Sequence, residues 1–148
     1  ARTLGLAVLA ATYALLLALR LQQWATPEKL WSAAYFQNPG SATAATWLGL
    51  LREEAGDAEG ARAFYQAAVA ANPQAVPAWI NWGVLEGKGG RWEESERLLR
   101  RAVEIGPRNA KGWQNLAVCL RGQGRAEEAA VAAARAAELQ GGYGSAKP

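Results

Sequence analysis

The chain of 148 residues has no histidine, no methionine and a single cysteine, Cys119. A lone cysteine excludes an intrachain disulfide bond, and the lack of histidine excludes a cysteine–histidine metal site. Isoleucine is also scarce, with two residues against 34 alanines. Alanine has the highest intrinsic helix propensity, whereas β-branched residues favour strands. This composition predicts an all-α fold, and we expect no metal, no other cofactor and no catalytic residue.

Charge is nearly balanced, with 16 basic and 13 acidic residues and a formal net charge of +3. The two signs alternate along the chain, as where Arg97 and Arg100 follow Glu94 and Glu96. Such interleaving is typical of a solvated helix face, and without a basic stripe we expect no nucleic-acid partner. The acid pairs Glu93–Glu94 and Glu127–Glu128 fall at helix starts, where carboxylates favour the helix dipole rather than catalysis.

An uncharged apolar run occupies residues 3–19, between Arg2 and Arg20. As a helix it spans about 25 Å, and the residues up to Trp24 extend it toward the ~30 Å hydrocarbon core of a bilayer. The run is apolar on all sides, unlike a surface helix of a globular protein. We therefore expect a single-pass transmembrane helix within residues 1–24, with Arg20, Trp24 and Trp31 at the membrane interface. A buried core helix and a signal peptide are the alternatives.

A short helix is expected in the junction that follows, residues 25–41. Thr26 supplies a capping hydroxyl, Pro27 suits the first helical position, and Glu28 places an acid at the positive end of the dipole. Pro39 disfavours helix in the residue before it, so this helix is expected to end near Asn38.

A spacing of 34 residues is the most regular feature of the chain. It recurs in three sets of residues: Pro39, Pro73 and Pro107; Ala34, Ala68, Ala102 and Ala136; Gly56, Gly90 and Gly124. A fixed period of this size indicates a solenoid of stacked helix pairs. The expected repeats are 42–75 (helices near 42–54 and 58–71), 76–109 (76–88 and 92–105) and 110–143 (110–122 and 126–139). Residues 144–148 are expected to form a disordered tail.

These repeats resemble the tetratricopeptide repeat (TPR) family. The family pattern is matched by Trp79-Ile80-Asn81-Trp82-Gly83 with Gly90, Glu94, Ala102 and Pro107, and again by Trp113-Gln114-Asn115-Leu116-Ala117 with Gly124. The first repeat is weaker, because Trp47 is displaced by two positions. The resemblance implies antiparallel helix pairs, a half repeat at the junction and three full repeats. It also implies a scaffold that binds a protein partner in a concave groove.

The resemblance also assigns the residues of that groove, which the first helix of each repeat would line. Leu50, Val84 and Val118 would form an apolar floor suited to a partner peptide or helix. Asn81 and Asn115 share a phase, and their amides would either contact the ligand backbone or satisfy a neighbouring helix. Trp79, Trp113 and Cys119 are expected to be packing residues. The full expected set is Trp47, Leu50, Glu54, Ile80, Asn81, Val84, Lys88, Lys111, Gln114, Asn115, Val118 and Arg121.

The junction has a second, narrower resemblance. Arg20, Trp24, Leu30-Trp31, Pro39 and Leu48-Gly49 are similar to the segment that joins the last membrane helix to the first TPR in membrane O-mannosyltransferases with C-terminal TPRs. This implies an alternative, in which the chain is the C-terminal region of a multi-spanning glycosyltransferase with its catalytic residues elsewhere. A third interpretation is an accessory subunit of a membrane complex. Such a family places its repeats on the non-cytoplasmic side, so we expect a bacterial inner-membrane location with the repeats in the periplasm.

Overall fold

The computed structural model describes residues 11–20 and 26–144, with side chains to residue 141. All the regular secondary structure in these ranges is α-helical, as the composition predicts. Residues 11–20 are helical, and the helices that follow are α2 (Pro27–Gln37), α3 (Ala42–Glu54), α4 (Ala58–Ala71), α5 (Val76–Lys88), α6 (Trp92–Ile105), α7 (Ala110–Gly122) and α8 (Ala126–Gly144).

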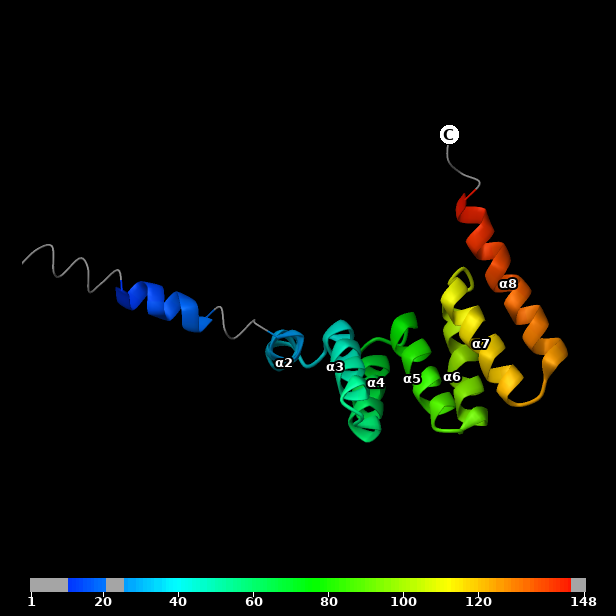
Figure 1. Ribbon diagram of the computed structural model, residues 1–148, viewed down its shortest axis with the longest axis horizontal. Helices are drawn as coiled ribbons and strands as arrows, with labels where there is room; N and C mark the ends of the chain where they lie inside the picture. Colours follow the sequence, from blue (N-terminus) through cyan, green and yellow to red (C-terminus); the bar gives the residue numbers. More distant parts are fainter. Residues whose placement is uncertain (1–10, 21–25, 145–148) are drawn as a thin grey trace, which may run out of the picture.

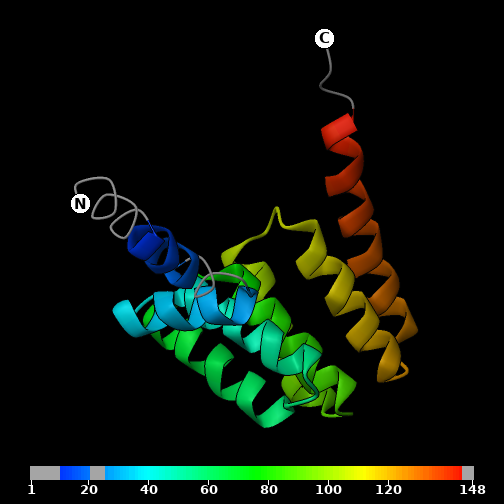
Figure 2. The same ribbon diagram turned by 60° about the vertical axis from the view of Figure 1, so that its left-hand side comes forward.

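The helices α3 to α8 form a solenoid of three stacked antiparallel pairs (Figure 1). Helix α3 pairs with α4, α5 with α6, and α7 with α8, and each second helix packs on the first helix of the next pair. In addition, α3 contacts α5 and α5 contacts α7. The three first helices therefore line one side of the solenoid, while α2 packs on α3 at the N-terminal end (Figure 2).

Short local signals set the helix boundaries. The side chains of Asp57 and Asn109 accept hydrogen bonds from the amides of Gly60 and Gly112, at 2.8 and 3.1 Å, and so cap α4 and α7. The turn inside each pair contains a glycine with φ between 75° and 79°, in the left-handed region that favours glycine. These glycines are Gly56, Gly90 and Gly124.

The last helix extends beyond the range expected from the repeat. Helix α8 continues to Gly144, five residues past the expected end at Leu139. Asn72-Pro73 and Gly106-Pro107 end α4 and α6, but the third repeat has Gly141 where the proline would stand. Without that proline nothing breaks the hydrogen-bond ladder, so the helix continues. Of the expected tail, Gly144 is helical and residues 145–148 lie outside the described residues.

The two helices of each pair approach closely at one position, 16 residues apart in sequence. In the first repeat Gly49 lies against Tyr65, which is fully buried. A Cβ atom on Gly49 would stand 2.4 Å from a ring carbon of Tyr65, and one on Gly83 would stand 2.7 Å from Leu99 Cγ. The first two pairs thus combine one bulky side chain with a glycine, and in the third repeat Ala117 and Ala133 stand at the equivalent positions.

The repeated tryptophans are packing residues, as expected. Trp79 and Trp113 are half-buried against the core clusters between the helices. The indole Nε1 of each donates a hydrogen bond of 2.9 Å to a proline carbonyl oxygen, that of Pro73 and Pro107 respectively. These bonds join the first turn of a repeat to the loop before it. Cys119 is buried too, and its Sγ lies 3.4 Å from the carbonyl oxygen of Trp92.

The apolar N-terminal run is described only in part. Residues 11–20 are helical and every one of them is exposed, including Arg20. Within the described ranges, no helix is both long and apolar enough to cross a bilayer. The first half of the run and Trp24 lie outside the described residues. The third residue expected at the interface, Trp31, is half-buried and stacks on Trp47, with ring centroids 5.4 Å apart.

Candidate functional site

A hollow of about 480 Å³ opens on the side of the solenoid formed by the first helices. Its floor is apolar: Ile80 is 2 % exposed, Leu50 is half-buried, and Trp47 presents an indole that is 45 % exposed. Polar groups stand around this floor, among them Asn81 and Lys111. The complete lining is Ala42, Thr43, Thr46, Trp47, Leu50, Asn72, Ala75, Pro77, Ile80, Asn81, Asn109 and Lys111.

Trp47 has a different role from the tryptophans of the later repeats. It is in phase with Asn81 and Asn115, not with Trp79 and Trp113, and it therefore lies on the groove side of its helix. One face of its indole is covered by Trp31 of α2, at an interplanar angle of 8°. The half repeat thus supports the N-terminal wall of the hollow, and Trp47 offers a large, rigid apolar surface.

A second, smaller hollow of about 230 Å³ lies further along the same side. Val84 and Lys88 of α5 face Asn115 and Val118 of α7 across it, and Val118 is 57 % exposed. Its remaining lining comes from Gly87, Trp92, Ser95, Leu99 and Cys119. The two hollows together make a groove that crosses α3, α5 and α7, which we call the first-helix groove.

The two asparagines of the groove differ in their hydrogen bonds. Asn115 Nδ2 donates to the carbonyl oxygen of Lys111 at 2.9 Å, so its own helix uses part of its hydrogen-bonding capacity. Asn81 is half-buried at the edge of the larger hollow, and its side chain has no hydrogen bond to any described residue. A free amide here can both donate to and accept from a peptide backbone, so Asn81 is the better placed of the two.

Charge changes along the first-helix groove. Near α3, Glu53 accepts hydrogen bonds from Lys88 Nζ at 2.7 Å and from the Tyr65 hydroxyl at 3.0 Å. Burial, together with the Glu53 carboxylate, raises the pKa of Tyr65 well above its ordinary value, so this hydroxyl stays protonated. Lys111 and Arg121 on α7 have no acidic partner among the described residues. The α7 end of the groove is therefore the more positive one.

The structure brings together nine of the twelve groove residues expected from the sequence. Five of them line the larger hollow, namely Trp47, Leu50, Ile80, Asn81 and Lys111. Four line the smaller hollow, namely Val84, Lys88, Asn115 and Val118. Glu54, Gln114 and Arg121 are exposed and line neither hollow.

Several lining residues of the larger hollow were missed in the sequence, among them Thr43, Pro77, Asn72 and Asn109. Thr43 and Pro77 are in phase with Lys111, and that shared phase is the signal that would have found them. Asn72 and Asn109 lie at helix ends, where their side chains accept hydrogen bonds from Gln74 N and Gly112 N. Their capping role is readable from the sequence, but their position at the groove is a consequence of how the repeats stack.

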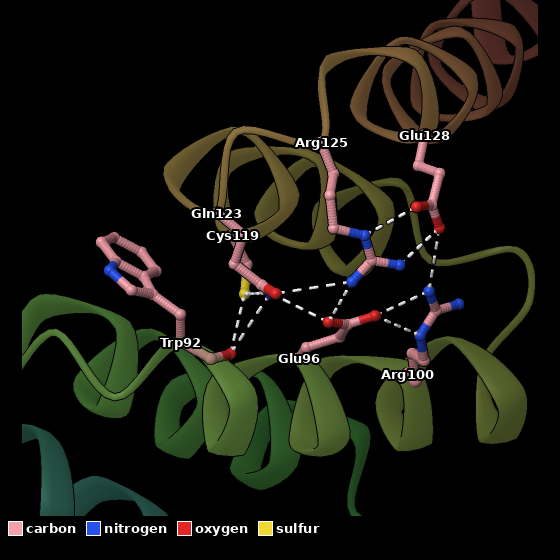
Figure 3. Close-up of polar contacts among 7 residues, drawn as sticks. All are labelled: Trp92, Glu96, Arg100, Cys119, Gln123, Arg125 and Glu128. Carbon is pink, nitrogen blue, oxygen red and sulfur yellow. Dashed lines mark hydrogen bonds and ion pairs between the residues drawn. The ribbon is translucent and has the colours of Figure 1, made fainter.

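A polar network joins the last three helices away from the groove floor (Figure 3). Glu96 of α6 accepts hydrogen bonds from Gln123 Nε2 at 2.9 Å and Arg125 Nη1 at 2.6 Å, and it is paired with Arg100. Burial opposes ionisation of Glu96, but these bonds outweigh it and lower its pKa. Arg125 is further held by Glu128, so every charge in the network is paired and its role is to fix α8. No cluster of metal-ligating side chains occurs in the described part of the chain.

Stacked helix pairs with a hollowed surface define an α-solenoid, a class of protein that presents an extended surface to other proteins. The chain belongs to the tetratricopeptide repeat family, whose model matches residues 4–76 and 80–144. The expected TPR membership is therefore confirmed.

Solved structures of the protein MamA share this fold. One has a TM-score of 0.70 at 18 % identity, over 82 % of this chain and 66 % of that chain. A second has a TM-score of 0.71 at 19 % identity, over 80 % and 71 %. A third has 0.64 at 25 % identity, over 78 % and 63 %. The chain spans about two thirds of the length of these structures. No curated protein sequence matches the chain. The three structures described above are of MamA and give no link to an O-mannosyltransferase.

Proposed function

We propose that this chain is a protein-interaction scaffold that holds a peptide or helix of a partner protein in the first-helix groove. The observation that carries the proposal is the larger hollow, which is lined by three successive first helices and has an apolar floor made by Trp47, Leu50 and Ile80. Apolar anchors in a hollow provide affinity, and the free amide of Asn81 provides a partner for a peptide backbone. We assign no catalytic residue to the groove, where the acid Glu53 is held in a pair with Lys88.

The occupant we propose has a large apolar side chain that fits between Trp47, Leu50 and Ile80. An acidic group further along the ligand would meet the unpaired Lys111, where opposite charges favour binding and orient the ligand. The Trp31–Trp47 stack keeps the anchor site preorganised, which reduces the entropy lost on binding.

We further propose that residues 3–19 attach the scaffold to a membrane, with the repeats in the bacterial periplasm. Support comes from the uncharged, all-round apolar sequence of the run and from the exposure of its described part, residues 11–20. Trp24 and Arg20 would then lie at the lipid–water interface. The alternative, a C-terminal region of a multi-spanning glycosyltransferase, is supported only by the junction resemblance. Membrane segments encoded upstream of Ala1 would favour it.

Peptide selection followed by a groove substitution tests the scaffold proposal. Decapeptides selected from a random library on the full chain in detergent are retested on Leu50→Glu, which places a charge on the apolar floor. We expect affinity to fall at least about tenfold, because a carboxylate next to an apolar anchor is desolvated without a partner. Fluorescence anisotropy of the labelled peptide gives the dissociation constant.

The matched control is Val131→Glu, which introduces the same charge at a 71 % exposed position on α8, away from the groove. This variant should bind the selected peptides like the wild type. Equal affinity of the peptides for the wild type, Leu50→Glu and Val131→Glu would show that the first-helix groove is not the binding site. A loss of affinity in Val131→Glu alone would show the same.

A further inference from the structure

We propose that helix α2 lies on a lipid surface, with Phe36 inserted at the boundary between headgroups and acyl chains. This inference rests on the proposed membrane attachment and adds to it a second contact, made by the solenoid itself. It assigns to the half repeat the task of holding the first-helix groove close to the bilayer.

The repeat allows α2 to be compared with its counterparts position by position. Phe36 is 86 % exposed, and the residues in the same phase of α4, α6 and α8 are Ala70, Glu104 and Glu138, which are exposed as well. Three repeats thus place a small or charged residue where the half repeat places a phenylalanine. The position is solvent-facing by fold, so the half repeat exposes a large aromatic side chain where the full repeats do not.

Leu30 supports the same conclusion on an adjoining face. Its counterparts Leu98 and Ala132 are 0 % and 3 % exposed and Phe64 is half-buried, whereas Leu30 is 39 % exposed. Helix α2 contains no buried residue in the structure, in contrast to α4 and α6. The half repeat therefore leaves uncovered the apolar groups that a preceding helix would cover.

The apolar run cannot cover them in the way that the other repeats do. It keeps the repeat phase, and the family match begins at residue 4. However, the close-approach position then pairs Leu15 with Trp31, where the full repeats have Gly49 with Tyr65 or Ala117 with Ala133. A Cβ atom added to Gly49 would already overlap the Tyr65 ring. The two large side chains of Leu15 and Trp31 at the equivalent positions therefore prevent an equally close approach of the run to α2.

The connection departs from the repeat as well. Gln22 stands where the full repeats have the turn glycine with positive φ. Helix α2 begins at Pro27, which is three positions later in the repeat than the start of its counterpart α4. Consistent with these substitutions, the described part of the run lies beyond α2 and is exposed throughout (Figure 1). Residues 11–20 and α2 thus both expose apolar side chains at the N-terminal end of the described chain.

The charges beside Phe36 favour lipid over a second copy of the chain as the occupant. Lys29 lies two helical turns before Phe36 on the same face, and neither it nor Arg20 has an acidic partner among the described residues. The one acid of α2, Glu28, is within 3.6 Å of Arg52. An exposed aromatic residue with an unpaired cation on the same helix face is the pattern of an interfacial helix on anionic lipid. Two copies meeting through this face would instead bring their cations together.

Site-specific fluorescence in vesicles tests this contact. The full chain with Cys119→Ala and Phe36→Cys is labelled with an environment-sensitive nitrobenzoxadiazole dye and reconstituted in vesicles of phosphatidylcholine and phosphatidylglycerol. The matched control has Cys119→Ala and Val131→Cys, an exposed apolar position on a second helix at the other end of the solenoid. We expect the emission at position 36 to rise roughly twofold over detergent-free buffer and nitroxide-labelled lipid to quench it, with neither effect at position 131.

Flotation of the same samples separates the two proposals. A chain that floats with the vesicles while the dye at position 36 is unquenched would retain the membrane attachment and overturn the inference about α2. A chain that does not float would overturn both. A dye response at position 36 that follows protein concentration rather than lipid would identify a second copy as the occupant and also overturn the inference.

Discussion

At the scale of single residues, the close approach inside each pair determines what the repeat tolerates. Gly49 and Tyr65 fill one small volume together, and so do Gly83 and Leu99. The combination matters more than either residue, because the interior is close-packed and cannot absorb another methyl group without shifting its neighbours.

Gly49→Ala should therefore destabilise the protein. The new Cβ would stand 2.4 Å from the Tyr65 ring, which is fully buried and has no free space to move into. We expect a loss of about 1–3 kcal/mol in the free energy of unfolding, measured by urea denaturation followed by circular dichroism.

The control is Gly141→Ala, since a Cβ at Gly141 in α8 would meet nothing within 4 Å. There the higher helix propensity of alanine should leave the stability unchanged or raise it by up to about 1 kcal/mol. Equal effects at the two positions would mean that the close approach does not limit packing.

At the scale of helices, one buried acid connects two repeats. Glu86 of α5 is 2 % exposed and accepts hydrogen bonds from Arg62 Nε of α4 at 2.7 Å and from Trp82 Nε1 at 2.9 Å. It also accepts one from Arg91, the residue before α6. Burial opposes the ionisation of Glu86, but the three donors outweigh it and lower its pKa below 4.5. The carboxylate thus holds α4, α5 and the start of α6 in register.

Glu86→Gln should lower stability and its dependence on pH. The lowered pKa means that this carboxylate stabilises the fold fully above its ordinary pKa of about 4.5 and loses that effect as the pH falls through the lower, folded value. At pH 7 we expect a loss of about 2 kcal/mol, because two arginines lose a charged acceptor. Below pH 4.5 the difference between variant and wild type should shrink.

Urea denaturation at several pH values measures both effects. The matched control is Glu104→Gln, an exposed acid paired with Arg101, which should change stability by less than about 0.5 kcal/mol. A Glu86→Gln protein with the same stability as the wild type from pH 7 to pH 3 would contradict this account of the cluster.

The helix boundaries could be predicted from the sequence because the residues that set them act locally. The positive-φ turn glycines and the prolines before each repeat bound α3 to α7 where they were expected. The groove was predicted as far as it depends on phase, as with Leu50, Ile80 and Asn81. What depends on stacking between repeats was not predicted, which explains why Asn72 and the stacking of Trp31 on Trp47 were missed. The end of α8 was missed for a different reason, the lack of a proline at 141.

At the scale of the whole molecule, the repeats form a unit that does not depend on the N-terminal run. The core clusters consist of residues from α2 to α8, and the described residues 11–20 are all exposed. In a solenoid each repeat is stabilised by its immediate neighbours, so a segment whose described residues are all exposed should contribute little to folding.

A fragment of residues 25–148 should therefore fold like the full chain. We expect the same helical content per residue in the repeats and a Tm within about 3 °C of the full chain in the same detergent, because the described residues that the fragment lacks, 11–20, are all exposed. Differential scanning calorimetry measures the transition. A Tm lower by 10 °C or more would mean that the run packs on the repeats.

The arrangement of Trp47, Asn81 and Asn115 in one phase has a consequence for how this scaffold diversifies. These three side chains face the groove, whereas the residues that hold each pair together, such as Gly49 and Tyr65, lie at other phases of the repeat. Single substitutions at these positions, which are 34 residues apart, can therefore change ligand preference during evolution. The packing residues that maintain the fold need not change. Relatives with the same packing residues but different residues at this phase would be paralogues that recognise different partners.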